Sequence, residues 1–177
     1  MKTKAIALLA LLALASPGPA RAEGWTDPHA GTARREIAFV TSTGRHPVAV
    51  EVASDEESRD AGLSGRDTVP AGTGMLYDFG EDRDVGMWMK DNRIALDMVF
   101  VRADGQVADV RPDNTPGDLA PVKAALPVRY VVEMPAGAAA AMGLARLDTL
   151  DLAGQPPSAA AAAAPAPGAG EDGRGDE

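Results

Sequence analysis

The sequence contains no cysteine. Disulfides, thiolate nucleophiles and cysteine-bound metals are therefore excluded, and the burial of apolar side chains must hold the fold together. Histidine is almost as scarce, and only His29 and His46 occur. Neither stands in a Ser-His-Asp pattern, and no metal-ligand spacing or glycine-rich phosphate loop is present. The sequence therefore predicts no catalytic residue of these types, no metal site and no cofactor.

Positive charge is also in short supply. The chain has 17 Lys and Arg residues against 26 Asp and Glu residues, which gives a formal net charge of −9. An acidic protein repels the phosphate backbone of nucleic acids and the headgroups of anionic lipids. We therefore expect no nucleic-acid partner and no docking on an anionic membrane.

Long apolar runs are confined to the N-terminal end of the chain. Two lysines precede an apolar run over residues 5–15, and residues 20–22 form an Ala-x-Ala cleavage signal. This combination is typical of a secretory signal peptide. We predict a signal peptide over residues 1–22 and hence a periplasmic protein, with full secretion as the second choice. No later run is long enough to span a bilayer, so no stable membrane insertion is expected after cleavage.

The rest of the chain divides into three parts by composition. Residues 23–35 form a polar lead-in segment, and residues 36–153 are long enough for one core and too short for two ordinary domains. Residues 154–177 are rich in alanine, proline, glycine and acidic residues. Because this tail lacks large apolar side chains, we predict that it is disordered.

Short stretches of alternating apolar residues dominate the predicted domain. Such stretches predict strands, and turn signals such as Ala-Asp-Gly at 103–105 separate them. The predicted strands cover residues 37–39, 48–53, 75–79, 85–91, 96–102, 107–111, 130–134 and 149–152. Many short strands with frequent turns are typical of a mainly β fold, a small antiparallel β-sandwich or barrel.

One or two short helices complete this fold. Ser54 and Glu57 have the spacing of a capping box, and Gly62 stands where a short helix would end. Residues 136–144 are rich in alanine and also favour a helix.

Five motifs stand in a distinctive order along the domain. They are GLSGR at 62–66, GML at 74–76, MWMK at 87–90, LDMVF at 96–100 and EMPAG at 133–137. In order and spacing they resemble the prokaryotic family named domain of unknown function 192, over about residues 37–152. The resemblance implies a compact, mainly β domain of sandwich type, often behind a signal peptide, with no established activity.

Trp88, Lys90 and Asp97 are candidate binding residues. On a strand, Trp88 and Lys90 share one face, and a turn over residues 92–95 would bring Asp97 opposite Lys90. An indole, a cation and a carboxylate that converge can orient a polar ligand. The alternative is a structural ion pair at a strand end, with Trp88 partly in the core.

Arg66 and Glu133 complete the candidate set. Arg66 follows two glycines that leave the backbone accessible, so it could receive a carboxylate or phosphate, or it could pin its loop to a core acid. Glu133 is a supporting carboxylate in the binding hypothesis. In the competing hypothesis, Glu133 and Asp97 form the carboxylate pair of an acid/base hydrolase acting on an envelope polymer.

These observations favour a non-enzyme. We predict a non-catalytic domain of the cell envelope that binds a small molecule or serves as an accessory protein, with Arg66, Trp88, Lys90, Asp97 and Glu133 around a shallow site. The alternatives are the hydrolase and a protein-interaction module with an envelope protein as its partner.

Overall fold

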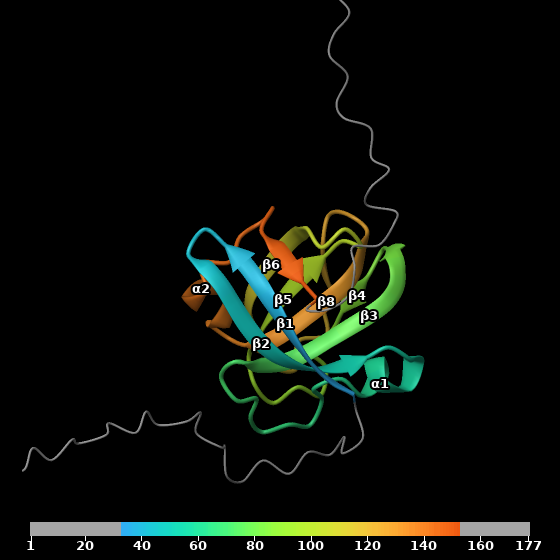
Figure 1. Ribbon diagram of the computed structural model, residues 1–177. Helices are drawn as coiled ribbons and strands as arrows, with labels where there is room; N and C mark the ends of the chain where they lie inside the picture. The colour runs from blue at the N-terminus through green and yellow to red at the C-terminus, as the bar shows by residue number, and fades with distance from the viewer. Residues whose placement is uncertain (1–32, 153–177) are drawn as a thin grey trace, which may run out of the picture.

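The computed structural model describes residues 33–152, which form a mainly β domain with two short helices, as predicted (Figure 1). The predicted signal peptide and the predicted tail lie outside the described residues, as does the lead-in up to residue 32. The elements are β1 (Arg34–Thr41), β2 (Gly44–Ala53), α1 (Glu56–Ala61), β3 (Thr73–Arg83), β4 (Gly86–Met87), β5 (Leu96–Val101), β6 (Val107–Asn114), β7 (Val122–Lys123), β8 (Val128–Pro135), α2 (Ala138–Ala141) and β9 (Thr149–Asp151).

Seven strands form one strongly curled sheet, in the order β6-β5-β8-β3-β2-β1-β9. An isolated bridge between Gln106 and Thr149 joins the two ends of this order, so the sheet closes on itself at one point. Figure 1 shows the sheet curling round on itself. Neither described helix is long or apolar enough to cross a membrane.

One neighbouring pair departs from the predicted antiparallel arrangement. β2 and β3 run parallel, whereas the other neighbours in the sheet are antiparallel. A parallel pair needs a crossover connection of a dozen or more residues. Residues 54–72, which include α1, supply this crossover and lie over the outer face of the sheet.

Apolar clusters cover both faces of β3, β5 and β8. One lies inside the curl and includes Leu76, Val99 and Val132, and the other lies outside it and includes Met75 and Met98. Because successive side chains of a strand point to opposite faces, a strand between two cores is buried along its whole length. Every residue of β5 is accordingly buried.

Two local predictions were wrong. The capping box of α1 is formed by Asp55 and Ser58, one residue later than predicted. The predicted strand over residues 85–91 is reduced to β4, which pairs only with β7. The chain turns after Met87, since the amide of Asn92 donates to the carbonyl of Met89 at 3.1 Å and Asp91 has a positive φ of 61°.

Asp97 is fully buried on the inner face of β5. Its Oδ1 accepts a hydrogen bond from the amide of Asp113 at 2.9 Å, and its Oδ2 accepts one from the amide of Ala139 at 2.8 Å. The second bond replaces an N-cap side chain, because the N-cap residue of α2 is Gly137 and provides none. Asp97 therefore ties the end of β6 and the start of α2 to the central sheet.

Replacement of Asp97 by Asn tests this role. The amide nitrogen of Asn would face a backbone N–H, so one hydrogen bond is lost and a buried donor is left without a partner. We expect Asp97→Asn to lower the free energy of unfolding by about 1–3 kcal/mol, measured by urea denaturation. Asp84→Asn, at an exposed position, is the matched control. Equal stability of the two variants would contradict the role.

Candidate functional site

A cavity of about 350 Å³ lies on the outer side of β3 and β8. Two covering segments form its walls: α1 with the loop that follows it, and residues 86–92. They meet where the amide of Gly65 donates to the carbonyl of Asp91 at 2.8 Å. The volume is at the small end of the range of ligand pockets. The lining residues are Arg59, Asp60, Gly62, Leu63, Ser64, Tyr77, Phe79, Gly86, Met87, Trp88, Lys90, Asp91, Asn92 and Glu133.

Glu133 is the buried acidic group of this site, which we call the Glu133 cavity. It pairs in register with Met75 of β3 and Met98 of β5, so all three side chains share the outer face of the sheet. The hydroxyl of Tyr77 donates to Glu133 Oε2 at 2.7 Å, and within residues 33–152 this is the one hydrogen bond that the carboxyl group makes.

Burial sets the protonation of this pair. It raises the pKa of Glu133 to about 7, although the hydrogen bond from Tyr77 lowers that pKa in part. Burial also raises the pKa of Tyr77 well above its usual value, and the charge of Glu133 raises it further. Tyr77 therefore remains a donor, whereas Glu133 can lose or gain a proton near neutral pH.

Gly62 leaves room for the Tyr77 hydroxyl. A Cβ atom at position 62 would lie 2.5 Å from that oxygen, closer than atoms can pack. Gly62 also has a positive φ of 47°, which side chains disfavour. Both space and backbone conformation therefore require glycine beside the Glu133–Tyr77 pair.

The remaining lining differs in how far its polar groups are already engaged. Arg59 Nη1 donates to the carbonyls of Ser54 and Asp78, and its guanidinium lies 5.4 Å from the centroid of the Phe79 ring. Asn92 is buried, and its Oδ1 has no hydrogen-bond partner among the described residues. Trp88 is 59% exposed.

The structure brings three of the five predicted site residues to one place. Trp88, Lys90 and Glu133 line the Glu133 cavity. Arg66 lies outside the lining and donates from Nη1 and Nη2 to the two carboxylate oxygens of Glu51, at 3.0 and 2.7 Å. Both side chains of this pair are buried, so Arg66 pins its loop to a core acid, one of the two predicted alternatives.

Asp97 and Glu133 do not come together. Asp97 pairs with Met134, whereas Glu133 pairs with Met98, so the two carboxyl groups project from opposite faces of the sheet. The expected approach of Asp97 to Lys90 does not occur either, because both Asp97 oxygens bind backbone amides on the inner face. The hypothesis that Asp97 and Glu133 form the carboxylate pair of a hydrolase is therefore wrong.

Sequence reasoning missed Tyr77 and Asn92 as members of the site. The alternating pattern places Tyr77 on a strand and says nothing more of it. Its hydroxyl is the available signal, because a tyrosine on a buried strand needs a hydrogen-bond partner. Asn92 gives no comparable signal, since its burial depends on the turn after Met89.

The chain belongs to the family DUF192, described as "Uncharacterized ACR", whose model matches residues 38–152. This confirms the resemblance found in the five motifs. No curated protein matches this chain.

Two solved structures share the fold. The first is a Sinorhizobium meliloti protein described as a candidate transcription regulator. It is 36% identical, with a TM-score of 0.67, and the match covers 70% of this chain and 97% of that one. The second is a Novosphingobium aromaticivorans protein of unknown function. It is 26% identical, with a TM-score of 0.68, and the match covers 77% of this chain and 99% of that one.

The raised pKa of Glu133 predicts a specific pH dependence of stability. The unfolded chain loses this proton near pH 4.5 and the folded protein near pH 7, so between these values the unfolded state binds fewer protons. The free energy of unfolding should therefore fall as the pH rises through this window, by roughly 3 kcal/mol from this group.

Glu133→Gln removes that contribution while it keeps an acceptor for Tyr77. We expect the variant to be more stable than the unmodified protein at pH 8, by up to roughly 3 kcal/mol, and similar to it at pH 4. Urea denaturation at both pH values measures the difference. Glu81→Gln, at an exposed position, is the matched control. Parallel pH profiles for the Glu133→Gln variant and the unmodified protein would contradict the assignment.

A second prediction concerns the buried ion pair. Arg66→Met leaves Glu51 buried without its cation, and we expect a loss of about 3–5 kcal/mol in the free energy of unfolding. The double variant Glu51→Met/Arg66→Met should recover much of this loss, because neither charge is then buried alone. Chemical denaturation of both variants provides the comparison. A loss below about 1 kcal/mol in the single variant would show that the pair is not needed.

Proposed function

We propose that this protein is a non-catalytic small-ligand-binding protein of the cell envelope, and that its ligand occupies the Glu133 cavity. The observation that carries the proposal is the buried Glu133–Tyr77 pair in a cavity that also exposes the indole of Trp88. Small-molecule sites are concave, with apolar and aromatic walls and a few convergent polar groups. The envelope location rests on the predicted signal peptide.

Trp88 supports a binding role. Its flanking residues Met87 and Met89 are buried, whereas Trp88 is 59% exposed beside the cavity. An exposed ring offers a ligand a large rigid contact surface at a small cost in side-chain entropy. Lys90 lies two residues further on and is in no ion pair within residues 33–152, so its ammonium group is available to a ligand.

The lining offers little for catalysis. Ser64 is a hydroxyl that lines the cavity, but the one histidine among the described residues, His46, hydrogen-bonds the hydroxyls of Thr41 and Thr43 instead. A serine nucleophile needs a base within hydrogen-bond reach. Glu133 is the one buried carboxyl group of the lining, and Asp97 is on the other face. This arrangement favours binding over acid/base hydrolysis.

The Sinorhizobium meliloti relative raises the question of DNA binding. With a net charge of −9, this chain lacks the excess of basic residues that neutralises backbone phosphates. A role in transcription would therefore have to run through a small ligand or a protein partner. A protein-interaction module is the alternative function, and failure of the ligand screen would indicate it.

A thermal-shift screen of the purified protein tests the proposal. Sugars, peptidoglycan fragments, amino acids and nucleotides should include at least one class that raises the melting temperature by several degrees, because a ligand at about 100 times its Kd adds about 2.7 kcal/mol. The shift should be lost in Trp88→Ala and Lys90→Ala, which exchange exposed side chains and should fold normally.

The control is Leu126→Ala, which removes a large exposed apolar side chain outside the cavity. This variant should keep the full ligand shift. The proposal fails if no class of compound stabilises the protein, or if the stabilisation does not depend on Trp88 or Lys90.

A further inference from the structure

Glu133 is a buried acid that forms no ion pair with any cation of residues 33–152. The pKa of Glu133 is shifted by burial and by the Tyr77 hydrogen bond, with no cation among the causes. Two arginines of this region are engaged elsewhere: Arg66 is held by both oxygens of Glu51, and Arg59 by two backbone carbonyls. Lys90 lines the cavity but forms no ion pair with Glu133. A buried carboxylate without a cation is costly, and a fold that keeps one sacrifices stability at that position.

The walls of the cavity specify what else a ligand must have. The rings of Tyr77, Phe79 and Trp88 line it, and ring faces attract cations as well as apolar groups. Asp60 and Asp91 also line it and form no ion pair within residues 33–152. These carboxylates disfavour an anionic ligand near Glu133.

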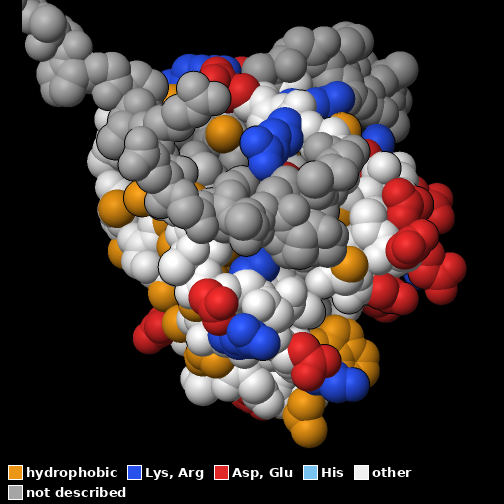
Figure 2. Space-filling view, turned by 90° about the horizontal axis from the view of Figure 1, so that it is seen from below, with side chains coloured by type: hydrophobic (Ala, Val, Ile, Leu, Met, Phe, Trp, Pro, Cys, Tyr) orange, Lys and Arg blue, Asp and Glu red, His pale blue; other side chains and the backbone are white. Residues whose placement is uncertain are grey.

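The outer surface beside the cavity is acidic as well. The exposed side of α1 carries Glu56, Glu57 and Asp60. Figure 2 shows acidic side chains gathered at the edge of the molecule where α1 lies. An acidic surface next to a cavity raises the local concentration of small cations.

We propose that the ligand is a small amine or guanidine whose cationic group hydrogen-bonds to Glu133 and whose apolar body packs on the rings of Tyr77, Phe79 and Trp88. This inference rests on the proposed function, because it names the ligand class of the same cavity. The cation supplies the charge that the buried carboxylate lacks, and a charge-assisted hydrogen bond of this kind is among the stronger ones in proteins.

Binding of a cation should be linked to a proton. The amine selects ionised Glu133, so below pH 7 binding must displace the proton that the free protein carries there. Affinity should therefore weaken about tenfold between pH 8 and pH 6. The other charged or titratable groups around Glu133 are Tyr77 on β3, Arg59 and Asp60 on α1, Lys90 and Asp91 in the turn after β4, and the Glu51–Arg66 pair beside β3.

Isothermal titration calorimetry of the purified protein with charge-matched probes is the test. Phenethylamine is compared with 2-phenylethanol and phenylacetate, and putrescine with 1,4-butanediol, at pH 6 and pH 8. We expect an amine to bind at least tenfold more tightly than its alcohol at pH 8. At pH 6 nearly one proton should be released, counted from the heats in two buffers of different ionisation enthalpy.

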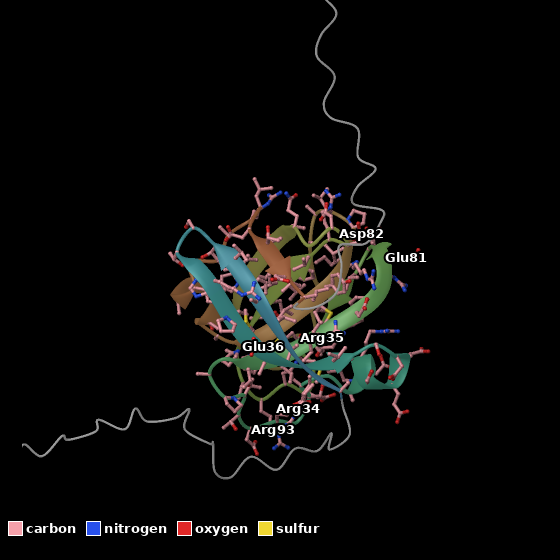
Figure 3. All side chains as sticks on the ribbon, in the orientation of Figure 1. Arg34, Arg35, Glu36, Glu81, Asp82 and Arg93 are labelled. Carbon is pink, nitrogen blue, oxygen red and sulfur yellow. The ribbon has the colours of Figure 1, made fainter. Side chains whose placement is uncertain are left out.

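Glu133→Gln keeps the shape of the side chain and removes its charge. In this variant the preference for the amine and the pH dependence should both disappear, while binding of the alcohol is retained. The matched control is Glu81→Gln; Figure 3 shows Glu81 near the upper end of the long strand β3, and it is not among the cavity residues. This variant should behave like the unmodified protein. Asp60→Asn, which removes the charge of an exposed acid of the lining, shows how much of the amine preference comes from Asp60 and how much from Glu133.

The outcomes separate the inference from the proposed function. Equal binding of amine and alcohol, preference for phenylacetate, or an amine preference that survives Glu133→Gln overturns the amine class, while a site dependent on Trp88 still stands. Absence of binding by every amine, together with a Trp88-dependent hit from another class in the ligand screen, also overturns the amine class alone. If neither experiment yields any ligand, both proposals fail.

Discussion

The buried ion pair between Arg66 and Glu51 joins the loop after α1, one of the two segments that cover the outer apolar cluster, to the sheet beneath it. Glu51 belongs to β2, whereas Arg66 lies in the crossover after α1, so the pair ties the crossover back to the strand that precedes it. The same loop contacts the second covering segment through Gly65 and Asp91. Because both segments that wall the Glu133 cavity are held through this region, the shape of the cavity depends on an ion pair that lies outside its lining.

Three buried carboxyl groups in this small domain are accommodated in three different ways. Glu51 has a bidentate cation, and Asp97 has two backbone amides, one for each oxygen. Glu133 has one tyrosine hydroxyl. The first two arrangements satisfy the charge and serve the architecture. The third leaves a carboxyl group with a pKa of about 7 in a cavity, a combination that is frequent at functional sites.

Period-two patterns made much of the sheet predictable. Alternation over residues 75–79 and 130–134 located β3 and β8, and the Ala-Asp-Gly turn located the hairpin of β5 and β6. Once the register of β5 on β8 is known, the alternation of side chains along each strand places Asp97 and Glu133 on opposite faces of the sheet. That register is set by contacts distant in sequence, so the sequence by itself allowed the wrong pairing.

The covering segment of residues 86–92 could not be predicted in the same way. Residues 87–90 keep an alternation of buried and exposed side chains, which is typical of a strand, yet beyond Met87 the backbone bonds to loops instead of to a neighbouring strand. Trp88 and Lys90 consequently fall on one side as expected, but the acid that shares their cavity is Glu133, from a strand more than 40 residues away in the chain. Local pattern determines which side chains are exposed, and tertiary contacts determine what they are exposed to.

The glycine beside the Tyr77 hydroxyl has a consequence for comparison within the family. Position 62 admits no side chain as long as the tyrosine reaches the buried glutamate, for reasons of both space and backbone conformation. A family member with any larger residue there must have moved its tyrosine or given up the pair. The identity of that single residue therefore distinguishes relatives that share this cavity from relatives that share only the scaffold.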